Sequence, residues 1–210
     1  MQIAIDGPAG SGKTSVAQAL AKELQFTHLD TGAMFRALSV VLSEEEIREE
    51  KDIEKRLSRT NLQMIPDGVS IDGRHLTDEL RTETIDQEVS YYSQLKVVRD
   101  WLLAKQRELA SELDVVMDGR DIGTVVLPKA EVKVFLTASK EIRALRRALQ
   151  TNRMDEYSEI LADIERRDHI DSKRALAPLR AADDAYVLDT TELNFDEVLE
   201  KIRHLVEEKR

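Results

Sequence analysis

The chain has 210 residues, of which 41% are hydrophobic and 34% charged, as expected for one compact globular domain with a sizeable core. Its 41 acidic and 31 basic side chains give a net charge of −10, which argues against an extended, non-specific grip on nucleic acid. The lack of cysteine excludes a disulfide framework, a thiolate zinc site and a thiol nucleophile. An apolar strand begins at Gln2 and no window approaches about 18 consecutive apolar residues, so we expect a cytoplasmic protein with neither a signal peptide nor a membrane span.

The first informative stretch is residues 7–14, which read Gly-Pro-Ala-Gly-Ser-Gly-Lys-Thr. This is the phosphate-binding loop pattern of Gly, four free positions, Gly, Lys and Ser or Thr. An apolar run at 3–5 predicts a buried strand before it, and apolar residues at every fourth position predict a helix after it. Backbone N–H groups converge on an anion at such a junction. We therefore expect Lys13 to contact the β- and γ-phosphates and Thr14 to ligate Mg²⁺, rather than a glycine-rich turn with a solvated lysine.

Residues 26–30 predict a short strand, and the segment from Thr31 leads from its end into another helix. Open α/β sheets place ligands at the carboxyl ends of parallel strands. Asp30 and Thr31 are therefore candidate ligands, although they could equally cap the helix. Arg36 is interpreted as a clamp for a substrate phosphate, because guanidinium matches phosphate oxygens, with a surface arginine as the alternative.

The pattern changes in the following segment. Residues 43–58 are densely charged and predict a solvated helical face. Between 62 and 76 apolar residues alternate in twos around turn signals at Pro66-Asp67-Gly68 and Asp72-Gly73, which predicts an antiparallel meander. We interpret the meander as an inserted subdomain that can close over a substrate. Residues 95–109 predict a helix in which Trp101 packs rather than stacks on a base.

A second informative stretch is the apolar strand predicted at 115–117, which ends in Asp-Gly-Arg-Asp. In phosphate-loop enzymes an acidic residue at the end of a neighbouring strand organises Mg²⁺ or its water shell. Asp118 fits that position, and the alternative is a structural ion-pair network around the arginine. Residues 132–136 predict a further strand.

Arginines are concentrated between 143 and 180 in a chain that is acidic overall. A helix predicted over 142–149 carries three on one face, and like charges at that spacing destabilise a helix by roughly 0.2–0.5 kcal/mol per pair. We interpret the segment as a mobile lid that closes over polyphosphate and excludes water. The alternative is local ion pairs with Glu141, Glu165 and Asp168. The arginines are Arg143, Arg146, Arg147, Arg153, Arg166, Arg167, Arg174 and Arg180.

The last part of the chain predicts a strand at 186–189 and a final helix. Asn194 with Glu197 three positions later predicts a capping box that opens this helix. The four histidines have no ligand-like spacing and are interpreted as structural or exposed.

Together these stretches resemble the bacterial cytidylate kinases, nucleoside monophosphate kinases among the P-loop phosphotransferases. The similarity lies in residues 3–14, 29–36, 117–128, 167–179 and 189–193. Asp-Gly-Arg-Asp-Ile-Gly-Thr combined with Ala-Pro-Leu is specific to that family, whereas the phosphate loop is not. The resemblance implies a P-loop three-layer α/β/α fold with a five-stranded parallel sheet, in a single kinase domain over 1–210. It also implies a monophosphate-binding insert over 37–95 and a lid over 150–166.

The resemblance further implies roles for individual residues. Ser90, Arg99 and Asp121 match the family's cytosine pocket, where a carboxylate accepts from the exocyclic amine and a guanidinium donates to N3 and O2. The phosphate contacts fall on Thr31, Arg36, Arg120 and Arg174, and the sugar contacts on Arg167 and Asp171. The catalytic set is Lys13, Arg120, Arg167 and Arg174, and the metal set is Thr14 and Asp118. The ATP-binding set is Gly7, Pro8, Ala9, Gly10, Ser11, Gly12, Lys13, Thr14, Ser15 and Arg153.

We therefore expect transfer of the γ-phosphate of ATP to CMP or dCMP, with Mg²⁺, by a monomer that binds neither nucleic acid nor membrane. The acceptor is already a phosphate oxygen, so no strong general base is needed. Two alternatives remain. One is a kinase for another small acceptor such as AMP or UMP, and the other is a P-loop switch that binds nucleotide to recruit partners. The chain lacks the Asn-Lys-x-Asp guanine-reading motif, which argues against a switch.

Overall fold

The structure is a computed structural model that describes residues 1–65 and 68–210. The chain divides into two compact units, residues 1–29 with 110–210 and residues 30–109, and each is described by itself. The first turn predicted for the meander, at Pro66 and Asp67, lies outside the described residues. No helix in the described part of the chain has the length and apolar character needed to cross a bilayer.

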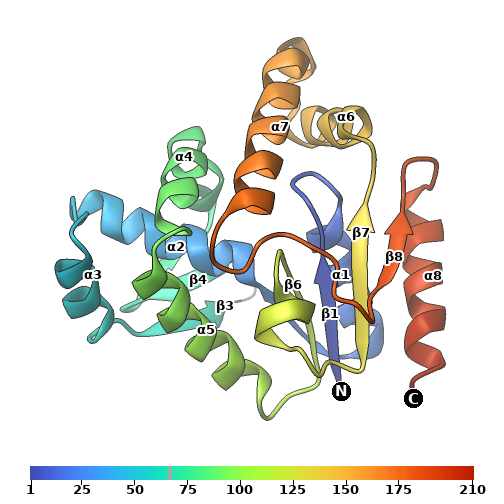
Figure 1. The fold of residues 1–210 in the computed structure, drawn as a ribbon, viewed down its shortest axis with the longest axis horizontal. Coiled ribbons are helices and arrows are strands. Elements are labelled where there is room, and N and C mark those ends of the chain that lie inside the picture. Colours follow the sequence, from blue (N-terminus) through green and yellow to red (C-terminus); the bar gives the residue numbers. More distant parts are fainter. Residues whose placement is uncertain (66–67) are drawn as a thin grey trace. The chain divides into compact units, whose positions relative to one another are not determined.

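The first unit is built on a five-stranded sheet in the order β2–β6–β1–β7–β8 (Figure 1). Central strand β1 is parallel to β6 and β7, and β7 is parallel to β8, so the carboxyl ends of these strands lie at one edge. This arrangement confirms the predicted parallel α/β class. The strands are β1 (Gln2–Asp6), β2 (Thr27–Asp30), β6 (Val115–Gly119), β7 (Val132–Thr137) and β8 (Tyr186–Asp189).

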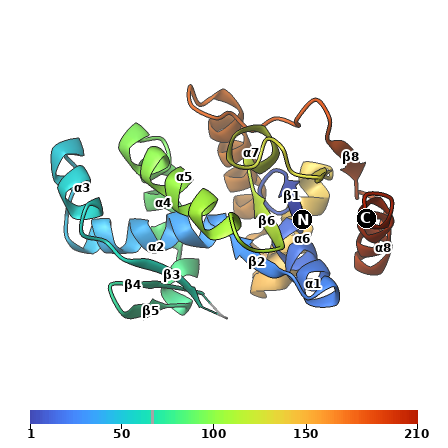
Figure 2. The ribbon, with the colours of Figure 1, turned by 90° about the horizontal axis from the view of Figure 1, so that it is seen from below.

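Helices cover both sides of this sheet, with α1 and α8 on one side and α7 on the other (Figure 2). Val16 and Leu20 of α1 and Ile202 of α8 are buried in one cluster with the apolar side chains of β1 and β7. Helices α6 and α7 share a smaller cluster that includes Ala144 and Ile160. These helices are α1 (Lys13–Leu24), α6 (Lys140–Thr151), α7 (Tyr157–Lys173) and α8 (Phe195–Glu207), with a π-helical turn at Ile122–Val126 and a 3₁₀ turn at Met154–Glu156.

In its described residues, the second unit combines helices with a small antiparallel sheet in the order β3–β4–β5. The turn between β4 and β5 is Asp72-Gly73, with φ of 53° and 85°, as a two-residue hairpin turn requires. The meander prediction is therefore confirmed. The elements are α2 (Thr31–Glu44), α3 (Glu50–Leu57), β3 (Leu62–Ile65), β4 (Gly68–Ile71), β5 (Arg74–Leu76), a 3₁₀ turn (Asp78–Arg81), α4 (Glu83–Tyr92) and α5 (Lys96–Ala110).

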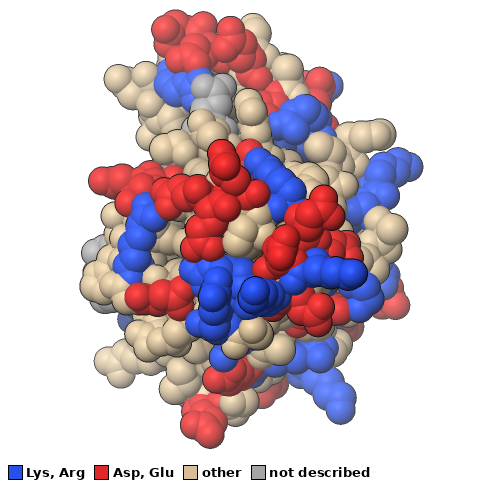
Figure 3. Space-filling view, turned by 90° about the vertical axis from the view of Figure 1, so that its left-hand side faces the viewer, with Lys and Arg blue, Asp and Glu red and all other residues tan. Residues whose placement is uncertain are grey.

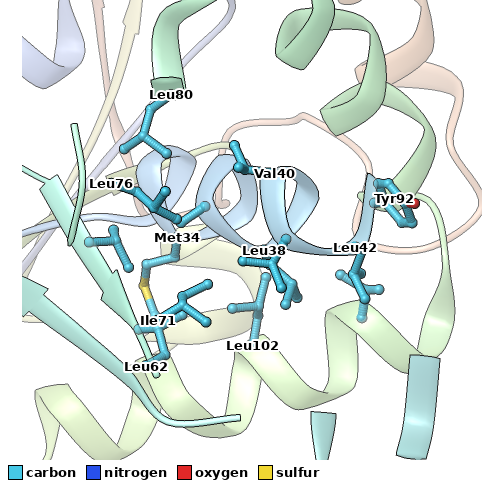
Figure 4. Close-up of a cluster of buried hydrophobic side chains, with 14 of the residues drawn as sticks. Met34, Leu38, Val40, Leu42, Leu62, Ile71, Leu76, Leu80, Tyr92 and Leu102 are labelled. Atoms are coloured by element: carbon cyan, nitrogen blue, oxygen red, sulfur yellow. The ribbon is translucent and has the colours of Figure 1, made fainter. Parts of the chain in front are cut away.

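This unit has a hydrophobic core of its own. Met34, Leu38 and Leu42 recur every fourth position along α2 and point into a cluster shared with the sheet, α4 and α5 (Figure 4). Tyr92 is fully buried in this cluster, and its hydroxyl donates to the Ile47 carbonyl at 2.9 Å. The unit can therefore hold its α-helices and β-strands in place through its own contacts.

The charged segment at 43–58 forms the end of α2, a loop and α3. Acidic and basic side chains are interspersed on the face of the molecule drawn in Figure 3, and Arg48 is paired with Glu88. Arg56 departs from the prediction of a solvated face, because it is buried and donates to Glu45 while pairing with Asp72.

Candidate active site

The loop between β1 and α1 is shaped by its glycines. A Cβ atom on Gly7 would lie 2.1 Å from the Leu136 carbonyl oxygen of β7, so no larger residue fits between the loop and that strand. Gly12 has φ of 85° at the N-cap of α1, in the left-handed region that favours glycine. The loop backbone can therefore bend tightly at the amino end of α1, where N–H groups have no intrahelical partners.

Two polar side chains of the loop are buried within it. The Lys13 ammonium donates to the Pro8 carbonyl at 3.2 Å, so the cation lies back over the loop. The Ser11 hydroxyl has no hydrogen-bond partner among the described residues although the side chain is 1% exposed. A buried orphan hydroxyl beside a lysine and a helix amino terminus is suited to an anionic ligand.

Asp118 lies at the carboxyl end of β6 and is almost fully buried. The Thr14 hydroxyl donates to its Oδ2 at 2.6 Å, and Nε2 of His28 lies 2.8 Å from its Oδ1. Both carboxylate oxygens are thus held by neighbours from α1 and β2. The structure brings the two predicted metal residues, Thr14 and Asp118, into direct contact.

The donor set fits a magnesium ion carried in by a nucleotide. Mg²⁺ prefers oxygen ligands, keeps several waters, and is commonly held by one or two protein groups plus phosphate oxygens. Thr14 and Asp118 supply a hydroxyl and a carboxylate of that kind. No group of three or more metal-ligating side chains occurs among residues 1–65 and 68–210, so an all-protein cage is not formed there.

Asp6, the last residue of β1, is a further buried carboxylate. It accepts the backbone N–H groups of Ile122 and Gly123, each at 2.7 Å. Burial raises its pKa from 3.8 to about 6, although the two N–H donors and Lys13 oppose the rise. Sequence reasoning missed this residue, for which the available signal was a carboxylate ending an otherwise apolar strand.

A group of paired charges follows β6. Arg120 donates to Asp171 at 2.9 Å, and Arg174 donates to Asp121 at 3.1 Å and to the Ala177 carbonyl at 2.6 Å. Burial would raise the pKa of Asp171, but the charges of Arg120 and Arg174 outweigh it and hold the pKa below its usual range. The structure thus brings together four of the residues predicted to bind the acceptor nucleotide. The charge of Arg167, from the same helix as Asp171, also lowers the pKa of Asp171.

A cavity of about 380 Å³ adjoins the phosphate loop. Its walls include residues 10–12 and Ser15 on the loop side, Arg146 and Arg147 from α6, and residues 193–195 after β8. The wall after β8 was not predicted as part of a site, since its sequence reads only as a helix start. A cavity of this size beside a phosphate loop can take the flat base of a nucleotide.

Two arginines of the predicted lid instead donate hydrogen bonds to groups within the protein. Arg143 is buried and donates to the carbonyls of Ala138 at 3.0 Å and Ala9 at 2.8 Å, while pairing with Asp168 at 2.7 Å. Arg146 donates to the Thr190 hydroxyl at 2.8 Å and its carbonyl at 2.6 Å. Arg143 thus forms the ion pair with Asp168 that the alternative predicted, whereas Arg146 donates to neutral acceptors of the fold.

Arg153, Arg166 and Arg167 lie near carboxylates of the same segment. Arg153 donates to Glu156 at 2.9 Å through Nε, and Arg166 pairs with Asp163. Arg167 lies 3.7 Å from the same Asp163. Such partly exposed pairs contribute little to stability.

The remaining predicted residues belong to the second unit. Asp30 caps α2, since its carboxylate accepts the Ala33 N–H at 2.9 Å, and Thr31 is buried as the first residue of that helix. Arg36 donates to the Leu80 carbonyl at 3.1 Å and pairs with Asp86. Ser90 donates to the Asp86 carbonyl at 3.0 Å, and Arg99 donates to the Ser93 carbonyl at 3.2 Å above the Phe35 ring.

The contact between His28 and Asp118 was also missed by sequence reasoning, which gave the histidines no role. His28 precedes Asp30 by two positions in β2, and β2 neighbours β6 in the sheet. Spacing along the chain carries no sign of this contact, because it depends on strand order.

Comparisons with known proteins agree over nearly the whole chain. A family profile described as cytidylate kinase matches residues 3–208. A cytidylate kinase of Alkaliphilus oremlandii is 44% identical over 211 residues, covering 98% of this chain and 97% of that protein. A cytidylate kinase of Carboxydothermus hydrogenoformans is 43% identical over 218 residues, covering 100% and 98%. An uncharacterized protein of Eubacterium ventriosum has a similar solved structure, with a TM-score of 0.56 over 99% of this chain and 98% of that one, and at 13% identity this likeness concerns the fold alone.

Proposed function

Because the chain belongs to the cytidylate kinase family, we propose that it transfers the γ-phosphate of ATP to CMP or dCMP, giving ADP and CDP or dCDP. One observation carries the proposal: the first unit holds two separate arrangements suited to phosphate. One is the loop at 7–14, and the other is the charge group formed by Arg120, Asp121, Asp171 and Arg174. A phosphotransferase that moves a phosphoryl group from one nucleotide to another needs both arrangements, whereas a nucleotide switch needs only the first.

ATP is the ligand of the loop. Its β- and γ-phosphates accept from backbone N–H groups of the loop at 9–15 and from Lys13, and the Ser11 hydroxyl gains a partner. The adenine occupies the cavity of about 380 Å³, where Arg146 and Arg147 supply guanidinium groups on one wall. Arg153 exchanges Glu156 for a phosphate oxygen when the segment 150–166 acts as a lid.

Thr14 and Asp118 would hold Mg²⁺, the hydroxyl directly and the carboxylate directly or through water. The ion would supply charge neutralisation to the β- and γ-phosphates. Asp118 is positioned for this by Thr14 and His28, which fix its two oxygens.

CMP is the ligand of the charge group. The Asp121 carboxylate accepts from the exocyclic amine of cytosine, which uracil lacks, and Arg120 and Arg174 bind the acceptor phosphate. Arg167 and Asp171 bind the sugar. From the family resemblance alone, we assign Thr31 and Arg36 to the monophosphate and Ser90 and Arg99 to the base. The same resemblance assigns residues 37–95 to a monophosphate-binding insert.

The chemical step is an in-line displacement at the γ-phosphorus. An oxygen of the CMP phosphate forms the new bond while the bond to the β–γ bridging oxygen breaks, and ADP leaves with that oxygen. The acceptor oxygen is already ionised, so no side chain needs to remove a proton. Lys13, Arg120, Arg167 and Arg174 neutralise the charge on the transferring group, and positioning supplies the rest of the rate. A cytoplasmic monomer remains our expectation for the working form.

The test is steady-state ADP production from ATP with CMP, dCMP, UMP, AMP or dTMP offered separately. We expect turnover with CMP and dCMP to exceed that with UMP, and this preference to be lost in Asp121→Ala. Asp183→Ala removes a fully exposed carboxylate and serves as the matched control. ADP release that is indifferent to every monophosphate would contradict the kinase and leave an ATPase or a switch.

A further inference from the structure

Asp6 takes no part in the mechanism above, yet it is one of the most deeply buried carboxylates of the first unit. In the register of β1 and β6, Asp6 pairs with Gly119, which brings the residues that follow β6 alongside its carboxylate. One oxygen accepts from Ile122 N–H and the other from Gly123 N–H, each at 2.7 Å. Both bonds link residues more than a hundred positions apart and close to the phosphate loop.

The backbone that Asp6 holds has an unusual form. After β6 the chain enters a π-helical turn at Ile122–Val126, and Asp121 precedes it with φ of −145° and ψ of 26°. Single π-helical turns are frequent at functional sites. The first N–H groups of a helical turn have no partner inside it, and here Asp6 supplies acceptors for two of them.

The fit around the carboxylate is close. A Cβ atom on Gly123 would lie 3.4 Å from Asp6 Oδ2 and 3.2 Å from the Lys133 side chain. The charges of Lys13 and Asp121 both act on Asp6, so the carboxylate lies near both the phosphate loop and the residue that precedes the turn. Burial also makes this charge costly to keep, since it raises the pKa to about 6. A costly charge retained beside two binding segments indicates a role beyond holding the fold.

We propose that Asp6 is a positioning residue for the acceptor nucleotide: by holding the N–H groups of Ile122 and Gly123, it fixes the orientation of Arg120 and Asp121. The inference rests on the proposed function. Asp6 itself touches neither nucleotide, and its carboxylate acts through the backbone of the turn. Loss of the two bonds lets residues 120–123 shift, and a displacement of about 1 Å at a positioning group is enough to cost a large factor in rate.

The test compares Asp6→Asn with the wild-type protein. Asparagine keeps the size of the side chain but offers one acceptor oxygen, so one N–H loses its partner. We expect the KM for CMP to rise by about tenfold or more while ATP binding, measured by calorimetry without CMP, changes by less than about threefold. Amide exchange of Ile122 and Gly123 should accelerate in the variant, which reports the turn independently of activity.

Two further variants keep the inference falsifiable if Asp6→Asn folds poorly. Gly123→Ala places a methyl group against the side chains of Lys133 and Asp6 without removing the carboxylate, and should also weaken CMP binding more than ATP binding. Val206→Ala truncates a fully buried side chain of α8 and controls for lost stability alone. It should leave the KM for CMP and the affinity for ATP unchanged.

The positioning role would be overturned if Asp6→Asn weakened CMP and ATP binding equally, or if the KM for CMP did not change. Wild-type protein that phosphorylates no monophosphate would instead remove the proposed function, and the acceptor assignment of Asp6 with it.

Discussion

The buried charge of Asp6 predicts a specific dependence of stability on pH. Its pKa is about 6 in the folded protein and near 3.8 in the unfolded chain. Between these values the folded state holds a proton that the unfolded chain has released, so folding stability falls as pH rises. Above about pH 7 the carboxylate is charged in both states and the loss is nearly complete. Asp6→Asn removes the titrating group and therefore this component of the pH dependence.

The size of the effect follows from the two pKa values. A rise from 3.8 to about 6 corresponds to about 3 kcal/mol between the acid and alkaline limits. About half of that, roughly 1.5 kcal/mol, is expected between pH 5 and pH 7.5, since part of the loss has already occurred at pH 5. The asparagine variant also leaves one backbone N–H without an acceptor, which costs about 1–3 kcal/mol at every pH and does not alter the slope.

The measurement is urea unfolding of both proteins at pH 5, 6 and 7.5, followed by far-UV circular dichroism. The quantity of interest is the free energy of unfolding of wild type minus that of the variant, because groups common to both proteins cancel. We expect this difference to decrease by roughly 1.5 kcal/mol from pH 5 to pH 7.5. A difference that stays constant, or grows with pH, would refute a raised pKa for Asp6.

Three further predictions concern the first unit. Gly7→Ala places a methyl group 2.1 Å from the Leu136 carbonyl oxygen, so we expect the variant to lose more than about 2 kcal/mol of stability and also to lose ATP binding. Thermal unfolding with and without ATP measures both effects, and an unchanged melting temperature would contradict the close approach. Thr14→Ala should weaken ATP binding about tenfold when Mg²⁺ is present and leave binding in EDTA unchanged, and equal weakening in both conditions would argue against a metal role for its hydroxyl. Arg143→Ala removes the buried guanidinium that pairs with Asp168 and donates to two carbonyls, so it should lower stability by about 3 kcal/mol or more. Arg166→Ala breaks an exposed pair and should lower stability by less than about 1 kcal/mol. Similar losses of stability in the two variants would show that Arg143 does not anchor the loop.

The elements predicted from local pattern were found in the structure. The strand before the phosphate loop and the hairpin at Asp72-Gly73 are determined by residues close together in the sequence, so a short stretch of sequence is enough to predict each of them. The contact between Thr14 and Asp118 was also within reach, because a known loop type implies an acidic residue on a neighbouring strand.

Contacts that depend on strand order could not be predicted. Asp6 accepts from the N–H groups of Ile122 and Gly123, which lie 116 and 117 positions later in the chain. Only the pairing of β1 with β6 brings these residues together. Arg143 looked like part of a cationic surface, yet it donates to Ala9 in the phosphate loop, 134 positions earlier. A helical arginine that binds phosphate and one that binds a carbonyl have the same local sequence pattern, so only tertiary structure separates them.

The position of the single tryptophan has a practical consequence. Trp101 packs against the core of the second unit, and the first unit contains no tryptophan. Tryptophan emission, excited selectively over tyrosine, therefore reports the melting of residues 30–109, while the dichroism signal averages the helices of both units. Emission that changes at a lower urea concentration than the dichroism would identify the second unit as a separately unfolding part of the chain, and coincident transitions would show that the two unfold as one.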